Sequence, residues 1–322
     1  MPDDARAPAG EEHDSRRAIV AAFLANLGIA LAKFGAFAVT GSASMLAESI
    51  HSVADTGNQG LLFLGGRRSR RAPTAEHQFG FGQERYFWAF VVALVLFSLG
   101  SLFALAEGVD KLRNPERLDS PIVAYTVLGI AIVLEAFSLH TAHREALEMR
   151  EPHRSWWYFI RTTKNAEIPV VLLEDTGALV GLAIALAGIS LAEVTGDPRW
   201  DAAGSLGIGA LLGVIAVVLA MEMKSLLIGE SVTPAYEAQI RAAMMDGPEV
   251  TRIIHLRTMH LGPDDVLVAA KLQLACDTMP ALATAIDTVE ERVRALVPVA
   301  KLIFLEPDIY RSSESEDAEE AG

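Results

Sequence analysis

The chain has a single cysteine, Cys276, among its 322 residues. This excludes an internal disulfide and fits a reducing compartment. The N-terminus lacks a basic segment followed by an apolar one, so we expect no cleavable signal peptide. Charged residues are also missing from long stretches, and the hydrophobic residues, 51% of the chain, cluster there. These apolar blocks are about 20 residues long, the length that crosses a bilayer, so the sequence predicts a multi-pass membrane protein.

The formal net charge of −14 is unevenly distributed. Most of this acidity lies in the first 14 residues and in the tail 312–322. Segments with high charge and few apolar residues cannot bury enough surface to fold. We therefore expect a disordered N-terminus at 1–17 and a disordered acidic tail at 312–322.

Six apolar stretches have the length of membrane spans. They lie at 18–39, 44–66, 86–109, 121–142, 167–192 and 202–227. Basic residues concentrate before the first span and after the second and fourth, whereas the opposite loops mix basic with acidic residues. Because cytosolic loops carry the basic excess, both termini should be cytosolic. Residues 18–229 are thus predicted to form an all-α bundle of six transmembrane helices.

The periodicity changes after the last span, in the segment 230–311. Helical periodicity appears at 233–245 and 280–296, and strand-like patterns appear at 250–259, 266–274 and 300–305. The order helix, strand, strand, helix, strand predicts a small cytosolic α+β domain. A domain of this size has a small core, so packing against a twin would stabilise it.

Ionisable residues interrupt the second predicted span. His51 and Asp55 are four residues apart, so a helix places them on one face, and Glu48 adds a third polar group there. Such residues are costly inside a bilayer and usually mark an ion path or a proton relay. Imidazole and carboxylate together suit a divalent transition metal. The alternative is a polar pair that only bonds two helices together.

A second cluster, Glu174 and Asp175, lies in the fifth predicted span. Asp175 is near the middle of the span and is a candidate metal ligand. Glu174 points about a hundred degrees away from it on a helix. It is a tentative ligand, with a helix–helix hydrogen bond or proton carriage as alternatives. Lys33, in the first span, is expected to extend its amine to the membrane surface.

Four stretches carry a resemblance to a known family. They are GSASMLAESIHSVAD at 41–55, HQFGFGQER at 77–85, the helix around Asp175, and LRTMH at 256–260. Together they resemble the cation diffusion facilitator (cation efflux) family over roughly residues 18–310. The variants DTGNQ at 55–59, ERYFW at 84–88, LEDT at 173–176 and TMHLGP at 258–263 are similar to its zinc-transporter-nine-like branch.

The resemblance implies a homodimeric exporter of zinc, manganese, iron or cobalt that works by proton antiport, with a ferredoxin-like cytosolic domain. It also implies a tetrahedral transport site with a ligand pair on each of two helices. His51 and Asp55 match the first pair, and Asp175 matches the last ligand. The remaining position holds Val171, which cannot bind metal, so Glu174, Glu48 or water would complete the set.

Two further metal sites of the family are incomplete in this sequence. In the loop after the second span His77 matches, but Thr74 and Phe81 occupy the other two positions. The metal-binding positions of the cytosolic domain hold Ile254, Lys271, Phe304 and Glu306. Since only the last of these is a usual ligand, the resemblance does not imply a cytosolic metal site here.

The sequence therefore predicts a divalent metal efflux transporter with zinc as the first candidate substrate and protons as counter-ion. It is not expected to be an enzyme. Its expected partners are the lipid bilayer and a second copy of itself, with no nucleic acid, and its expected location is a bacterial inner membrane. Two alternatives remain: an iron, manganese or cobalt exporter of the same family, and a membrane metal sensor or scaffold that does not transport.

Overall fold

The structure, a computed structural model, describes residues 27–115, 120–150 and 154–311. The predicted disordered ends at 1–17 and 312–322 lie outside these residues. The chain forms two compact units. One contains the described residues of Met1–Arg67 and Phe87–Lys224, and the other those of Arg68–Tyr86 and Ser225–Gly322.

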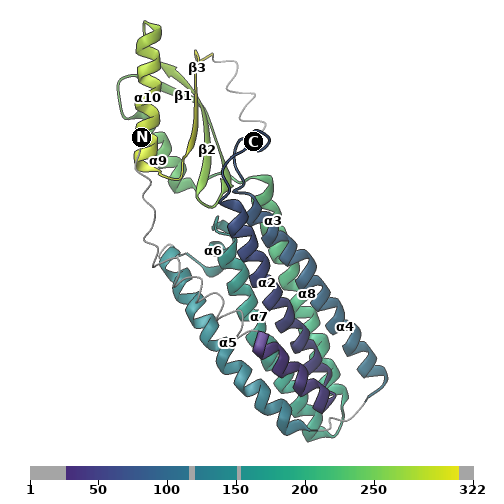
Figure 1. Cartoon of the computed structure of the whole chain (residues 1–322). Helices are drawn as coiled ribbons and strands as arrows, with labels where there is room; N and C mark the ends of the chain where they lie inside the picture. Colours follow the sequence, from purple (N-terminus) through teal and green to yellow (C-terminus); the bar gives the residue numbers. More distant parts are fainter. Residues whose placement is uncertain (1–26, 116–119, 151–153, 312–322) are drawn as a thin grey trace, which may run out of the picture. The chain divides into compact units, whose positions relative to one another are not determined.

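The first unit is built from helices (Figure 1). The described chain begins with a helix over Leu27–Thr40. The helices that follow are α2 (Ala43–Ser69), α3 (Glu84–Val91), the π-helix η1 (Val92–Phe97), α4 (Ser98–Arg113), α5 (Pro121–Met149), α6 (Trp156–Thr162), α7 (Glu167–Thr195) and α8 (Arg199–Ile228). Gly41 follows the last residue of this helix, and its positive φ of 64° is the left-handed conformation that favours glycine at a helix end.

Four helices in the described residues are long and apolar enough to cross a membrane: Glu84–Arg113, Pro121–Arg144, Glu167–Thr195 and Arg199–Ile228. They match the third to sixth predicted spans. The first predicted span, 18–39, begins outside the described residues, and its described part is shorter. The second predicted span forms α2, a helix of 27 residues whose polar side chains make it less apolar than the other four. Several apolar helices are therefore confirmed, and the count of six is not.

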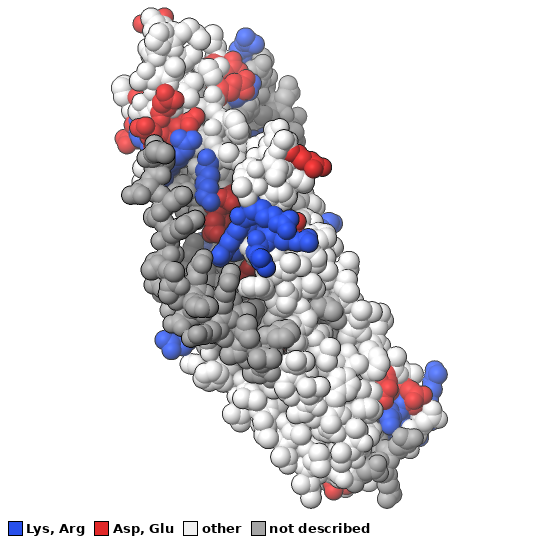
Figure 2. All heavy atoms as spheres, viewed as in Figure 1, with Lys and Arg blue, Asp and Glu red and all other residues white. Residues whose placement is uncertain are grey.

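The surface of the helical unit suits a bilayer. Its exposed side chains include many large apolar ones, among them Leu31, Leu102, Ile122, Phe137 and Val194. In the view of Figure 2, much of this unit carries no charged side chain except near its ends. Apolar patches of this extent mark membrane or protein contact.

Hydroxyl groups bind neighbouring helices together inside the bundle. Ser101 in α4 donates to the carbonyl of Gly209 in α8 at 2.7 Å, and Ser205 in α8 donates to the carbonyl of Ala104 at 2.8 Å. Small hydroxylated residues allow the close helix approach on which packing in a membrane depends. Each of the two helices, α4 and α8, therefore donates one hydrogen bond to the other.

A buried carboxylate fixes the start of α2. Asp201, in the first turn of α8, accepts hydrogen bonds from the Ser42 hydroxyl at 2.8 Å and from the backbone N–H of Ala43 at 2.8 Å. Ser44 donates its hydroxyl to the Asp201 carbonyl at 2.8 Å. Asp201 thus satisfies helix N–H groups that have no partner within α2 itself.

The short helix α6 was not predicted. Ser155 caps it by accepting from the backbone N–H of Tyr158, and Phe159 is buried with Ala146, Ile168 and Leu172. Its seven residues are too few to display helical periodicity in the sequence, so only the contacts with distant apolar residues show it.

The second unit contains a small α+β fold. Its elements are α9 (Pro234–Met245), β1 (Val250–Gly262), β2 (Asp265–Leu274), α10 (Met279–Leu296) and β3 (Leu302–Pro307). The three-stranded sheet has the order β1-β2-β3, with β1 antiparallel and β3 parallel to β2. The predicted order of helices and strands is confirmed.

Alternate residues of β2 form the core of this domain. Val266, Val268, Ala270 and Leu272 are buried, and they share a core cluster with Ile240 of α9 and with Val289 and Val293 of α10. The two helices therefore cover one face of the sheet (Figure 1). Alternation in a strand and spacing of three or four in a helix are the patterns that predicted these elements.

Candidate ion site within the helical unit

Polar side chains from four helices gather in the helical unit, where most of them are buried, Glu135 is half-buried and Ser138 is exposed. The Leu27–Thr40 helix contributes Lys33, α2 contributes Glu48, His51 and Ser52, α5 contributes Glu135 and Ser138, and α7 contributes Glu174 and Asp175. Hydrogen bonds or electrostatic interactions link the members of this set. Segments far apart in the sequence thus form one polar region among apolar helices.

Lys33 is completely buried, which contradicts the expectation that it extends to the membrane surface. Its ammonium donates to Glu48 Oε2 at 3.2 Å and to the Ser52 hydroxyl at 2.7 Å. The reason is that Lys33 lies on the face of its helix that meets α2. There Glu48 supplies the opposite charge that makes burial of an ammonium tolerable.

Glu48 is buried as completely as its partner. Only one of its oxygens, Oε2, meets Lys33, while Oε1 has no hydrogen-bond partner among the described residues. Oε1 instead faces Gly181 of α7, where an added Cβ would collide with it. Glu48 therefore lies between two helices and already has a fixed cation as its partner.

His51 is 1% exposed and lies one turn after Glu48 on α2. It is close enough to Lys33 for the ammonium charge to act on it. Asp55 is one further turn along the same helix, but its side chain lies outside what the structure describes. The helical backbone keeps His51 and Asp55 on one face, as the spacing predicts.

Glu174 and Asp175 are both buried, with 4% and 7% exposure. Asp175 accepts a hydrogen bond from the Ser138 hydroxyl of α5 at 2.9 Å. Glu174 interacts with the buried Asn58 of α2 and with Asp175. Glu174 and Asp175 point in different directions around the axis of α7. Both are nevertheless buried, because other helices cover α7 on more than one side.

The region contains more acidic than basic side chains. Glu48, Glu135, Glu174 and Asp175 interact with one another or with Lys33, the cation that pairs with Glu48. Among the described side chains, which exclude Asp55, no three His, Cys, Asp or Glu residues are arranged to hold a metal ion. Sequence reasoning missed Ser52 and Ser138, because a serine in an apolar helix gives no signal of its partner.

The metal positions that the resemblance suggests in the α+β domain are occupied differently. Lys271 Nζ lies 3.4 Å from Glu306 Oε1 and 3.3 Å from Asp308 Oδ2. Hydrogen bonds to Asp308 and Glu306 raise the pKa of Lys271. The backbone N–H of Ile309, and then Lys271, lower the pKa of Asp308. Glu306 is the only residue of this set that is a usual metal ligand. The ammonium group of Lys271 lies beside it, in the place that a metal ion would take.

Comparisons with known proteins agree with the motifs. Residues 19–228 match the cation efflux transmembrane domain. The human proton-coupled zinc antiporter SLC30A9, mitochondrial, is 34% identical over 241 residues, which are 74% of this chain and 42% of that protein. Metal tolerance protein C4 of Arabidopsis thaliana is 30% identical over 269 residues, or 81% of this chain and 57% of that protein.

A bacterial relative is matched over more of its own length. The cation-efflux pump FieF of Shigella flexneri is 27% identical over 250 residues, which are 77% of each chain. By contrast, this chain spans less than two thirds of SLC30A9 and of metal tolerance protein C4. The matched transmembrane domain nevertheless covers well over half of the sequence. The chain therefore belongs to the cation efflux family, on the branch that contains SLC30A9.

Proposed function

We propose that this protein is a transporter, not an enzyme, that exports divalent metal ions, with zinc as its main substrate and protons as the counter-ion. The observation that carries the proposal is the buried region of acidic residues and one histidine inside apolar helices. Buried carboxylates need a cation or a proton, and a transporter supplies both in turn. The names of the relatives, a proton-coupled zinc antiporter and a cation-efflux pump, support the same conclusion.

The proposed ligands are His51, Asp55 and Asp175, with Glu174 as the tentative fourth. The hydrogen bond from Ser138 supports a role for Asp175, because it orients the carboxylate without occupying both oxygens. Glu48 is the second choice for the fourth position, since one of its oxygens is already held by Lys33. One imidazole and three carboxylates would suit zinc, and oxygen-rich sets also admit harder ions such as iron or manganese.

Competition between metal and protons would couple the two fluxes. A metal requires deprotonated ligands, so protons compete for the same side chains. When the site opens toward the cytosol, metal would displace protons, and when it opens to the other side, protons would displace metal. Alternating access of one site thus gives antiport without a separate proton path.

We further propose six membrane spans, with the Leu27–Thr40 helix and α2 as the first two. The ion-site residues of α2 account for its polarity, since such side chains are tolerated in a span only where they face a bundle interior. The protein would be a homodimer in a bacterial inner membrane with both termini in the cytosol. The basic residues at the loop ends support this orientation.

The proposal is tested by metal flux into proteoliposomes containing the purified chain, with and without a pH gradient. Asp55→Ala and Asp175→Ala should each abolish flux, because each removes a ligand, whereas both variants should still fold and insert. Glu193→Gln, which changes an exposed carboxylate of α7, is the matched control and should transport normally.

Three results would contradict parts of this proposal. Normal flux in either alanine variant would overturn the assigned site. Flux that favours iron, manganese or cobalt over zinc would identify a different substrate. No flux of any of these metals by the wild-type chain would favour a membrane metal sensor or scaffold.

A further inference from the structure

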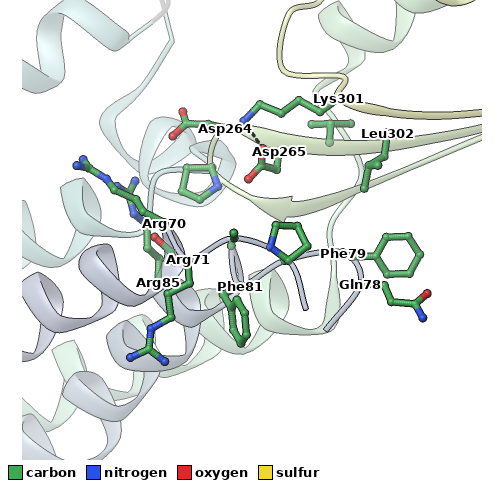
Figure 3. A pocket seen from close by; sticks show the side chains of 17 residues that line it. Arg70, Arg71, Gln78, Phe79, Phe81, Arg85, Asp264, Asp265, Lys301 and Leu302 are labelled. Carbon is green, nitrogen blue, oxygen red and sulfur yellow. Dashed lines mark ion pairs between the residues drawn. The ribbon is translucent and has the colours of Figure 1, made fainter. Parts of the chain in front are cut away.

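A pocket of about 550 Å³ lies within the second unit, apart from the ion site. Its walls come from the segment between α2 and α3 and from the α+β domain (Figure 3). Arg70, Arg71 and Arg85 line it on the loop side, and Asp264, Asp265 and Lys301 line it on the domain side. All of its lining residues belong to Arg68–Tyr86 or Ser225–Gly322. Nothing in the proposed transport cycle uses this pocket.

The loop that forms one wall is held in a defined shape. The backbone N–H of His77 donates to the Thr74 hydroxyl at 3.0 Å, and the N–H of Thr74 donates to the His77 carbonyl at 3.1 Å. Gly82 packs directly on the end of β1, so closely that a Cβ there would collide with the Leu261 carbonyl. Any residue other than glycine at position 82 would push this loop away from the end of β1. The pocket is therefore a built feature of the second unit.

The charge of the pocket is positive. Four basic side chains and two carboxylates line it, and Lys301 forms an ion pair with one carboxylate, that of Asp265. Arg70 and Arg71 are exposed, and neither makes an ion pair with any residue that the structure describes. In a chain whose net charge is −14, this concentration of guanidinium groups is a local exception. Basic side chains also gather on the face shown in Figure 2.

The location limits which anion can reach the pocket. Ser69, the last residue of α2, lines it, and so does Arg85, the second residue of a helix long enough to cross a membrane. Residues at the first turn of a spanning helix lie at the level of the lipid headgroups. Guanidinium groups bind phosphate oxygens in pairs of hydrogen bonds, which suits a phosphodiester. Clusters of basic residues next to a span are typical of anionic-lipid recognition.

We infer that this pocket binds a phosphate group, supplied by the headgroup of an anionic phospholipid, through Arg70 and Arg71. The carboxylate of Asp264 opposes the bound phosphate and limits its affinity. A lipid held here contacts both the loop between two membrane helices and the turn between β1 and β2. Binding is therefore expected to stabilise the second unit.

The test measures lipid binding to the purified full-length chain in detergent, by native mass spectrometry and by thermal shift. Phosphatidylglycerol should bind and raise the melting temperature, and phosphatidylcholine, which has no net charge, should bind much more weakly. Arg70→Gln/Arg71→Gln should weaken phosphatidylglycerol binding at least about tenfold, given about 1 kcal/mol per basic residue near the membrane surface. Asp264→Asn should strengthen it.

A matched control separates the pocket from charge in general. Arg67→Gln/Arg144→Gln removes the same charge from exposed helix-end arginines that do not line the pocket, and it should leave binding nearly unchanged. Equal losses in the two double variants, or equal binding of the two lipids, would overturn the site. Inorganic phosphate that binds as tightly as phosphatidylglycerol would overturn the assignment to lipid. Asp264→Asn tests the site in the direction of tighter binding, so the conclusion does not depend on whether the arginine variants fold.

Discussion

Val171 occupies the position at which the family resemblance implies a fourth metal ligand, and valine cannot bind metal. Glu48 and Glu174 are the two buried carboxylates proposed to replace that ligand. Glu48 is held by Lys33 through one oxygen, while Glu174 interacts with Asn58, Asp175 and Glu135 and forms no ion pair with any cation that the structure describes. An acid without a fixed cation gains more from a metal ion than an acid that already has one. The local charge balance therefore favours Glu174, although its direction on the helix differs from that of Asp175.

We expect Glu174→Gln to weaken metal binding at least about tenfold, or about 1.4 kcal/mol, and Glu48→Gln to weaken it less. Glutamine keeps the size and hydrogen bonding of glutamate and removes only the charge. Isothermal titration calorimetry on the purified chain measures both variants. A larger loss in Glu48→Gln would place the fourth ligand on α2, and no loss in either variant would leave that position to water.

The pair of Lys33 and Glu48 makes a prediction about stability. Lys33→Met should destabilise the protein by on the order of 3–5 kcal/mol, because it leaves a buried carboxylate without its cation. The double variant Lys33→Met/Glu48→Gln should recover most of this loss, since both charges are then gone. Thermal unfolding in detergent measures the difference, and Lys224→Met, at an exposed lysine of α8, is the control. Equal instability of the single and double variants would show that the pair does not act as a unit.

His51 is expected to determine metal preference. Replacing it by aspartate exchanges a nitrogen ligand for an oxygen ligand, which makes the site harder. We therefore expect His51→Asp to keep transport but to shift or broaden the order of metals toward manganese or iron. Competition of each metal with zinc in the flux assay reports this order. An unchanged order would mean that His51 does not contact the ion.

At the scale of elements, the position of α2 depends on a residue of α8. Asp201 accepts from the hydroxyl of Ser42 and from the backbone of Ala43, and His51 follows two turns later on the same helix. A shift of this helix end would move every ligand on α2 together. Asp201 thus affects the ion site only by positioning α2, the helix that carries His51.

Asp201→Ala should cost about 1–3 kcal/mol of stability, because it leaves several buried donors of Ser42, Ala43 and Ser44 without an acceptor. Hydrogen exchange should increase at the first turn of α2. Asp197→Ala, which removes an exposed carboxylate with one backbone bond to Arg199, should cost less. Identical protection of α2 in both variants would disprove this role.

At the scale of the whole molecule, the proposed dimer should not require metal in the α+β domain. Lys271 provides a positive charge to Glu306 and Asp308 from within the chain. The cation in this place is therefore always present, whatever the metal concentration in the cytosol. Control of transport by metal binding to this domain is correspondingly not expected.

Chelation of metal should thus leave the purified chain dimeric, as measured by light scattering after size exclusion. The ion pair between Lys271 and Asp308 should also persist over a wide pH range. The raised pKa of Lys271 keeps it protonated, so its contribution is lost only as pH rises beyond the ordinary lysine value of about 10.4. The lowered pKa of Asp308 keeps it ionised until pH falls below the ordinary aspartate value of about 3.9. Monomers after chelation at neutral pH would contradict this account.

Local sequence patterns were enough to predict the long helices, the strands and the main candidate site residues, but not the short helix α6. Apolar stretches of membrane length predicted the four longest apolar helices, and alternation predicted the strands of the α+β domain. The spacing of His51 and Asp55 placed them on one helical face. These features depend on residues close together in the chain, where backbone geometry alone fixes which side chains share a face.

Contacts between distant residues could not be predicted from the sequence and become visible in the packed helices. Lys33 and Glu48 are 15 residues apart, Ser138 and Asp175 are 37 apart, and Ser42 and Asp201 are 159 apart. No local pattern marks such pairs, so Lys33 was expected at the membrane surface and the serines were not noticed. The physical reason is that the stability of a buried charge depends on what packs against it, and helix packing brings that partner from elsewhere in the chain.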